Sequence, residues 1–248
     1  MTVYTYGDTQ WDVLASADQI ASTKSGYTSV TTIGTGGSIV PFIAYTDDHG
    51  SAVVKKLSGT TWQNVGGAIS AGHTSYTNIF SDKNGTIYLA YVDNDNGHRL
   101  AVKTFDAGSG TWEPLGGNDD NLYVSTGSVV NGVSQLSSSH NSWMAFDSQN
   151  VPYIVYAEMD DGGHPYVKKF DAGTWTTVGG GPVSATDKAS GVGIALSDDG
   201  TPYIAYAAGT GSTGQLVAYG FSGGAWTSLN VPEPLANGRH TSNIRHPA

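Results

Sequence analysis

Thr86-Ile87-Tyr88-Leu89-Ala90-Tyr91 is a strand-like stretch between the turn Asp82-Lys83-Asn84-Gly85 and Trp112. Alternating aromatic, β-branched and small residues bounded by turn residues predict β-strands. A third apolar segment separates each copy's last tyrosine from its tryptophan, so an antiparallel module has been repeated along the chain. The other copies are Phe42-Ile43-Ala44-Tyr45 with Trp62, Tyr153-Ile154-Val155-Tyr156 with Trp175, and Tyr203-Ile204-Ala205-Tyr206 with Trp226.

The tryptophans set the period of this repeat. Subtracting the numbers of Trp11, Trp62, Trp112, Trp175 and Trp226 gives spacings of 51, 50, 63 and 51 residues. Because about 40 to 50 residues is the span of one four-stranded blade, the sequence predicts an all-β, five-bladed β-propeller. We expect a single domain over residues 1–248, with blade boundaries near these tryptophans. The long spacing contains an insertion, residues 118–139, and extra loop length of this kind is typical of a functional face.

Each blade should begin with an inner strand, and the two chain ends supply parts of the same blade. The first residues, Val3-Tyr4-Thr5-Tyr6, fit a third strand, whereas the last residues fit an inner strand. We therefore expect the N- and C-terminal strands to share one blade, which closes the ring and removes its free edges. The predicted inner strands are residues 29–33, 76–80, 143–146, 192–196 and 242–246.

Composition narrows the classes of partner. Among 248 residues there are 34 glycines, charged residues make up only 13%, and the formal charge is -10. The negative charge argues against nucleic acid as a partner, because phosphate binding needs clustered basic residues and only 11 Lys and Arg are present. The absence of cysteine excludes disulfides and thiolate metal sites. A small molecule or a glycan, bound by a monomer, is the expected partner.

The sequence determines the compartment only weakly. We find no signal peptide and no apolar run long enough to span a bilayer, so no membrane association is expected. A secreted protein written without its leader would look the same, and a secreted location therefore stays open.

Four of the five predicted blades resemble the units of bacterial repeat propellers that are distantly similar to kelch and galactose-oxidase-type propellers, and two segments show the pattern. They are Asp199-Gly200-Thr201-Pro202-Tyr203 before Trp226, and Val167-Lys168-Lys169-Phe170 before Trp175-Thr176-Thr177-Val178-Gly179-Gly180. The resemblance covers nearly the whole chain and implies architecture rather than activity, since its residues are strands and turns. A five-bladed ring is also similar in architecture to tachylectin-type lectins and five-bladed glycosidases. No site residue is carried over from them.

Three histidines stand where predicted inner strands begin, in the short motifs His73-Thr74-Ser75, His140-Asn141-Ser142 and His240-Thr241-Ser242. Inner strands surround the central channel of a propeller, so these imidazoles could converge on its axis. Three imidazoles with an open position form a ligand set for Zn, Fe or Cu. The alternative is that each histidine bonds nearby backbone or fills the channel.

Further candidates lie in the polar loops that follow the second strands. His49, His98 and His164 should share the same face as the inner-strand starts. Acids accompany them and could complete a metal shell or act as general base, with Asp95 and Asp160 as the candidate catalytic residues. Any one acid in such a loop is more commonly a turn former. The other acids of these loops are Asp47, Asp48, Asp93, Glu158 and Asp161. Tyr27 and Lys188 precede other inner strands and could donate a proton or hold an oxyanion.

The uneven distribution of these residues favours one axial site over a site in every blade. The first hypothesis is a metal-dependent hydrolase or lyase with a single site at the channel mouth, with a glycan as one substrate class. The second is a carbohydrate-binding, lectin-like propeller without catalysis. The third is a structural or protein-binding propeller. Bound metal would favour the first, and several equal sugar sites would favour the second.

Overall fold

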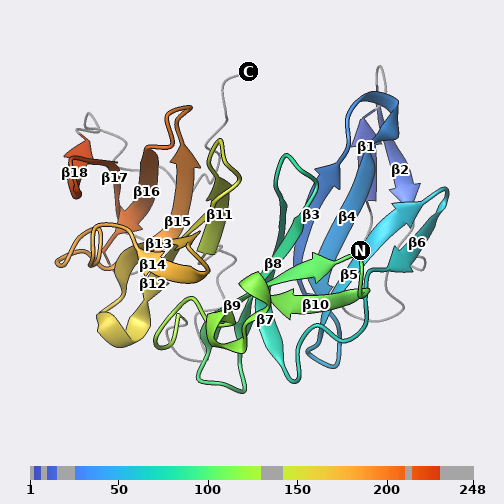
Figure 1. Ribbon diagram of the computed structural model, residues 1–248, viewed down its shortest axis with the longest axis horizontal. Coiled ribbons are helices and arrows are strands. Elements are labelled where there is room, and N and C mark those ends of the chain that lie inside the picture. The colour runs from blue at the N-terminus through green and yellow to red at the C-terminus, as the bar shows by residue number, and fades with distance from the viewer. Residues whose placement is uncertain (1–2, 7–9, 16–25, 130–141, 210–213, 230–248) are drawn as a thin grey trace. The chain divides into compact units, whose positions relative to one another are not determined.

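The computed structural model describes residues 3–6, 10–15, 26–129, 142–209 and 214–229. They form two compact units, residues 1–123 and residues 124–248. The strands make four four-stranded antiparallel sheets and one two-stranded sheet, so the chain is all-β, as the repeat predicts (Figure 1). No helix in the described part of the chain is long and apolar enough to cross a membrane. Its helical segments are η1 (Gly36–Ser38), η2 (Leu115–Gly117), η3 (Asp119–Asn121) and η4 (Met159–Asp161).

Unit 1 holds three sheets, which we call A, B and C. Sheet A has two strands, whereas sheets B and C have four each, and every strand pairs with its neighbour in chain order. Sheet A is β1 (Val3–Tyr6) and β2 (Trp11–Ala15); sheet B is β3 (Gly26–Ile33), β4 (Val40–Thr46), β5 (Ala52–Ser58) and β6 (Thr61–Asn64); sheet C is β7 (Thr74–Ser81), β8 (Ile87–Asp93), β9 (Arg99–Asp106) and β10 (Thr111–Pro114).

Unit 2 repeats the arrangement with two further sheets, D and E. Both have four antiparallel strands in chain order, because short turns join each strand to the next. Sheet D is β11 (Ser142–Phe146), β12 (Pro152–Glu158), β13 (His164–Asp171) and β14 (Thr174–Thr177); sheet E is β15 (Ala189–Leu196), β16 (Pro202–Ala208), β17 (Gln215–Ser222) and β18 (Ala225–Leu229).

Aspartates fix the turns between inner and second strands. Asp82 Oδ1 accepts the backbone N–H groups of Asn84 and Thr86, each at 2.9 Å. Asp147 holds the next sheet's turn in the same way, with Val151 N donating to its Oδ1 at 2.9 Å. These carboxylates are turn formers, because a short acidic side chain satisfies the backbone donors that a tight turn leaves unpaired.

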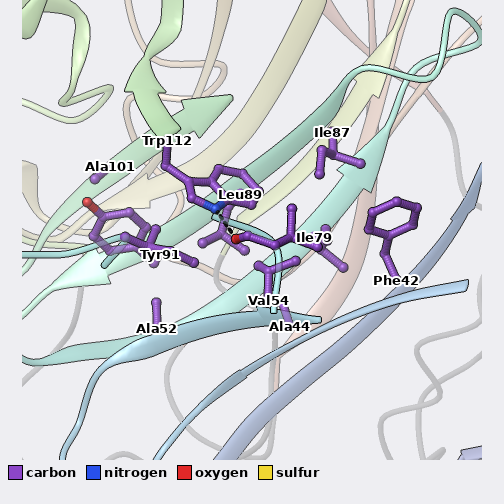
Figure 2. Close-up of a cluster of buried hydrophobic side chains, with 12 residues drawn as sticks. Phe42, Ala44, Ala52, Val54, Ile79, Ile87, Leu89, Tyr91, Ala101 and Trp112 are labelled. Carbon is purple, nitrogen blue, oxygen red and sulfur yellow. Dashed lines mark hydrogen bonds between the residues drawn. The ribbon is translucent and has the colours of Figure 1, made fainter. Parts of the chain in front are cut away.

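The core of unit 1 lies between sheets B and C. Apolar side chains from alternate positions of β4 and β5 pack against those of β7, β8 and β10, as Figure 2 shows. Trp112, only 4% exposed, covers the outer part of this core, and its Nε1 donates to the Val65 carbonyl at 2.8 Å. Leu89 and Ala44 are fully buried at the centre.

The core of unit 2 has the same design. Residues of β12 and β13 face residues of β15 and β16, and Trp226 packs at the outer side of the cluster. Its Nε1 donates to the Val178 carbonyl at 3.1 Å, which matches the bond of Trp112. The tryptophans of β10 and β18 therefore have a structural role, as their repetition predicts.

The predicted strand pattern is confirmed in the described residues. The inner strands are β3, β7, β11 and β15, and all four begin earlier than predicted. The fifth predicted inner strand, residues 242–246, lies outside the described residues. The shared closing blade, the count of five blades and the single domain therefore stay predictions.

The described part of the insertion contributes to both units. In unit 1, Tyr123 forms a β-bridge with Ala101, and Val102 N donates to the Leu122 carbonyl at 3.0 Å. In unit 2, Thr126 and Gly127 donate to the side chain of Glu158, the last residue of β12. The insertion thus adds ordered contacts to the sheets that flank it in the sequence.

Candidate functional site

The candidate site lies at the edge of each unit where the inner strands begin, which we call the strand-start edge. The loops after the second strands reach this edge, as predicted. Thr74 N donates to the Gly50 carbonyl at 2.6 Å, and Ala189 N donates to the Gly163 carbonyl at 2.9 Å. Each bond joins the start of an inner strand to the loop of the preceding sheet in the same unit.

His73 and Asp95 form a pair at the strand-start edge of unit 1. Asp95 Oδ2 accepts the backbone N–H of His73 at 2.9 Å, and the His73 Nδ1 lies 3.3 Å from the same oxygen. The His73 side chain is 67% exposed and lies over Gly50, where any Cβ would meet the ring. The backbone N–H of His73, followed by its ring, lowers the pKa of the Asp95 carboxyl. This carboxylate is therefore ionised and anchored to the start of β7.

Asp160 makes the corresponding bond in sheet D. Its Oδ2 accepts the backbone N–H of Ser128 at 2.9 Å, and Met159 N donates to the Ser128 carbonyl at 2.7 Å. In sheet C, Asn94 N donates to the His73 carbonyl at 2.9 Å. Ser128 thus holds the place in this repeat that His73 holds in sheet C.

Lys188 occupies the same place before β15. Gly209 N donates to its carbonyl at 2.9 Å, and its side chain lies over Gly163 as His73 lies over Gly50. The predicted ligand His73 and the predicted acid Lys188 are therefore equivalent residues of two different units. Their shared backbone contacts belong to the scaffold, and their side chains differ.

A β-bulge follows His73 and Lys188, and a third lies at the start of β3. In sheets B, C and E, two inner-strand residues face one residue of the second strand. The first residue of the bulge has a positive φ, 48° at Tyr27, 52° at Tyr76 and 58° at Gly191. Glycine is the ordinary occupant of such a position, since a Cβ makes it unfavourable. Two repeats use tyrosine where the third uses glycine.

The two bulge tyrosines contact each other. Their ring centroids are 4.7 Å apart with an interplanar angle of 42°. Tyr76 is buried, whereas Tyr27 is half-buried. Burial raises the pKa of both phenols, and the proximity of Tyr27 raises that of Tyr76 further. Both rings are therefore neutral near pH 7, and Tyr27 presents the more accessible one.

The remaining described histidines each have a local partner. His49 Nδ1 lies 3.0 Å from Asp48 Oδ1, and His98 Nδ1 lies 3.2 Å from the side-chain oxygen of Asn94. Asp47, Asp48 and His49 could hold a cation, since their ligand atoms lie within 4.8 Å of one another. The Asp47 carboxylate already accepts two backbone N–H groups of its own turn.

In unit 2, His164 Nδ1 lies 3.3 Å from Asp161, whose carboxylate also accepts the Tyr166 hydroxyl at 2.6 Å. The hydrogen bond from Tyr166, followed by that from His164, lowers the pKa of Asp161. Burial and the Asp161 carboxylate raise the pKa of Tyr166 to about 12.

Two of the acids that the sequence places in the histidine-bearing loops, Asp93 and Glu158, are buried and bind the insertion. Asp93 accepts the Tyr123 hydroxyl at 2.8 Å, and Arg99 lies over the Tyr123 ring at 3.6 Å. Burial, followed by the bond to Asp93, raises the pKa of Tyr123 to about 12. Glu158, 4% exposed, accepts three hydrogen bonds from Thr126 and Gly127. Both acids attach the insertion to a sheet.

The sequence analysis did not predict the bulge residue Tyr76 as a site residue, although comparison of the repeats indicates it. Gly26-Tyr27-Thr28-Ser29 and Ser75-Tyr76-Thr77-Asn78 place tyrosine at the same point of two repeats. Of the predicted metal ligands, His140 and His240 lie outside the described residues. The three-histidine set therefore stays a prediction, and the structure describes only His73.

Similar folds occur among solved structures. The chain matches the fucose-specific lectin from Aleuria aurantia with a TM-score of 0.51, at 16% identity over 91% of this chain and 68% of that chain. This is a propeller-like all-β fold. A protein of unknown function from Dyadobacter fermentans DSM 18053 matches with a TM-score of 0.51, at 15% identity over 82% of this chain and 68% of that chain. A polysaccharide lyase, an ulvan lyase, matches with a TM-score of 0.50, at 14% identity over 76% and 54%.

Sequence comparison adds no assignment. No family model matches the chain, and no curated protein matches it significantly by sequence. Identities as low as those above show the shared fold alone, so the kelch-like resemblance gains support for its architecture and none for a family.

Proposed function

We propose that this protein binds a carbohydrate at the strand-start edge of unit 1, with Tyr27 as the contact surface. One observation carries the proposal: Tyr27 and Tyr76 keep a backbone conformation that sheet E reserves for Gly191. For a residue with a side chain, this conformation costs about 1–2 kcal/mol. Strain of this kind is kept mainly where it positions a functional side chain.

The surroundings of Tyr27 suit a sugar. Tyrosine combines an apolar ring with a polar hydroxyl, and sites for small molecules join aromatic surface to a few fixed polar groups. Exposed polar groups at the same edge of unit 1 include His73, Asp95 and His98. Two proteins of similar fold are named as a fucose-specific lectin and an ulvan lyase, which supports a glycan as the ligand class.

The test is a binding screen against neutral and acidic oligosaccharides, followed by calorimetry on the best ligand. Tyr27→Gly should weaken binding at least tenfold while keeping the fold, because Gly191 shows that glycine fits this bulge. Tyr203→Ala is the matched control, since Tyr203 is 43% exposed on sheet E and away from any bulge. We expect one site per chain. Equal loss in both variants, or no sugar bound by the parent protein, contradicts the proposal.

A metal-dependent hydrolase or lyase at the same edge is the second candidate. Asp95 lies at the Nδ1 of His73 and leaves Nε2 available, an arrangement common for metal-binding histidines. His73, with His140 and His240, would hold a divalent ion, which when bound supplies an acidified water with a pKa of about 7. Tyr27 or Lys188 would then donate a proton or hold an oxyanion. The anchoring of Asp95 and Asp160 to backbone weakens their case as bases.

Elemental analysis of protein purified without a histidine tag separates the two candidates. The metal-dependent candidate requires about one Zn, Fe or Cu per chain, and this metal should be lost in His73→Lys. Lysine fits the scaffold at this place, because Lys188 lies over Gly163 as His73 lies over Gly50. His98→Ala is the control and should retain the metal. If the protein contains no metal and still binds sugar, only the carbohydrate-binding function remains.

A further inference from the structure

Trp112 in unit 1 and Trp226 in unit 2 share one rule of contact. Trp112 donates to the carbonyl of Val65, and Trp226 donates to the carbonyl of Val178. Each acceptor stands three residues after the tryptophan of the preceding sheet, Trp62 or Trp175 in turn. Each indole therefore bonds the outer strand of one sheet to the end of the sheet before it.

Glycines make room for this contact. A Cβ at Gly66 would lie 2.8 Å from the indole of Trp112, and one at Gly179 would lie 3.2 Å from that of Trp226. The seat for the indole is thus the acceptor residue together with the glycine after it.

Trp62 breaks the rule. It is 8% exposed, and its Nε1 is a buried side-chain donor without a hydrogen-bond partner in the described part of the chain. An N–H group removed from water without an acceptor is unfavourable, so such groups are rare in folded proteins. The rule names the missing acceptor as the carbonyl three residues after Trp11, which is that of Leu14.

Leu14 has the backbone such an acceptor needs. It lies in β2, and the pairing of β1 with β2 passes from Val13 to Ala15 without a partner for Leu14. The extra residue of a bulge is left out of the strand ladder, so its carbonyl is available to another donor. Trp62 and Leu14 therefore stand at the two positions that the contact rule connects. Trp62 Nε1 has no acceptor among the described residues, and Leu14 has no pairing partner in β1.

We propose that sheet A docks on sheet B through a hydrogen bond from Trp62 Nε1 to the Leu14 carbonyl. The docked surface is the outer part of sheet B around Trp62, and its occupant is the chain's own N-terminal sheet. The contact fixes the strand that precedes the connection to β3, and β3 carries Tyr27. Docking would therefore hold the sheet on which the proposed sugar contact lies.

The contact site for the indole in sheet A differs from the other two at one residue. The residue after the acceptor is Ala15, where the other seats have Gly66 and Gly179. In the docked arrangement that we propose, a Cβ at this position would limit how closely the indole approaches, as it would at Gly66 and Gly179. Ala15→Gly should therefore strengthen the contact, a gain that a merely local role of Trp62 does not predict.

The test uses exchange of indole and backbone protons with deuterated water in the full chain, with resonances assigned by single Trp→Phe changes. The Trp62 indole proton should exchange at least tenfold more slowly than an exposed indole, and more slowly again in Ala15→Gly. Trp62→Phe should speed exchange in β1 and β2 at least tenfold. Trp112→Phe is the control and should leave these two strands unchanged.

Three results overturn the proposal. Rapid exchange of the Trp62 indole would mean that solvent or a buried water satisfies it. Protection that depends on protein concentration would make a second copy of the chain the partner. No change in Ala15→Gly would remove Leu14 as the acceptor, and this variant gives an answer even if Trp62→Phe does not fold.

Discussion

Sheets B and C in unit 1 and sheets D and E in unit 2 are built on the same backbone contacts, yet they present different side chains at the strand-start edge. Trp112 and Trp226 make the same bond, and His73 and Lys188 rest on equivalent glycines. The bulge that follows holds Tyr76 in one unit and Gly191 in the other. Contacts kept in both units carry the fold, whereas the strained tyrosines of unit 1 are where we propose that a ligand binds.

The largest difference should appear when the tryptophans are truncated. Trp112→Ala should lower the free energy of unfolding by about 3–5 kcal/mol, because it empties a buried site and removes a hydrogen bond. Trp226→Ala should cost less, because that side chain is only half-buried. Urea unfolding followed by hydrogen exchange in each unit measures both. Equal losses would show that exposure does not separate the two units.

A smaller effect is expected at the bulge. Gly191→Ala should cost about 1 kcal/mol, because a Cβ there has open space but an unfavourable φ of 58°. Tyr27→Gly should change stability by less than about 1 kcal/mol, since relief of strain offsets the loss of a half-buried ring. Thermal unfolding of the two variants checks this. If Gly191→Ala is as stable as the parent protein, the backbone conformation of Tyr27 and Tyr76 is not strained.

The smallest effect concerns the carboxylates that anchor the strand starts. The pKa of Asp95 is lowered in the folded state, so its contribution to stability is present above its ordinary pKa of about 4. That contribution is lost as pH falls through the folded pKa. The stability difference between the parent and Asp95→Asn should therefore shrink with acidification, as unfolding midpoints at several pH values would show. Asp160→Asn is the comparison in unit 2, and no difference at neutral pH would deny Asp95 an anchoring role.

The sequence predicted the strands better than the site. Alternating residues and turns report local geometry, and four inner strands lie where they were expected. The roles of Asp95 and Asp160 could not be predicted, because their backbone partners lie 22 and 32 residues away. The equivalence of His73, Ser128 and Lys188 was hidden for the same reason. That equivalence depends on hydrogen bonds to loops. The histidine motifs, in contrast, were identified from similar residues at the predicted starts of strands.

By itself, the sequence determined an all-β repeat, its period and the structural role of Trp112 and Trp226, since these follow from spacing and from the size of the side chains. Only the tertiary structure showed which side chain and which backbone conformation each repeat has at the start of its inner strand. A bulge shifts register by one residue and reverses φ, and neither change leaves a mark in the pattern of apolar residues. The strained tyrosines come from pairing between strands, and the Trp62 donor, which has no partner among the described residues, depends on contact between sheets. Local sequence encodes neither.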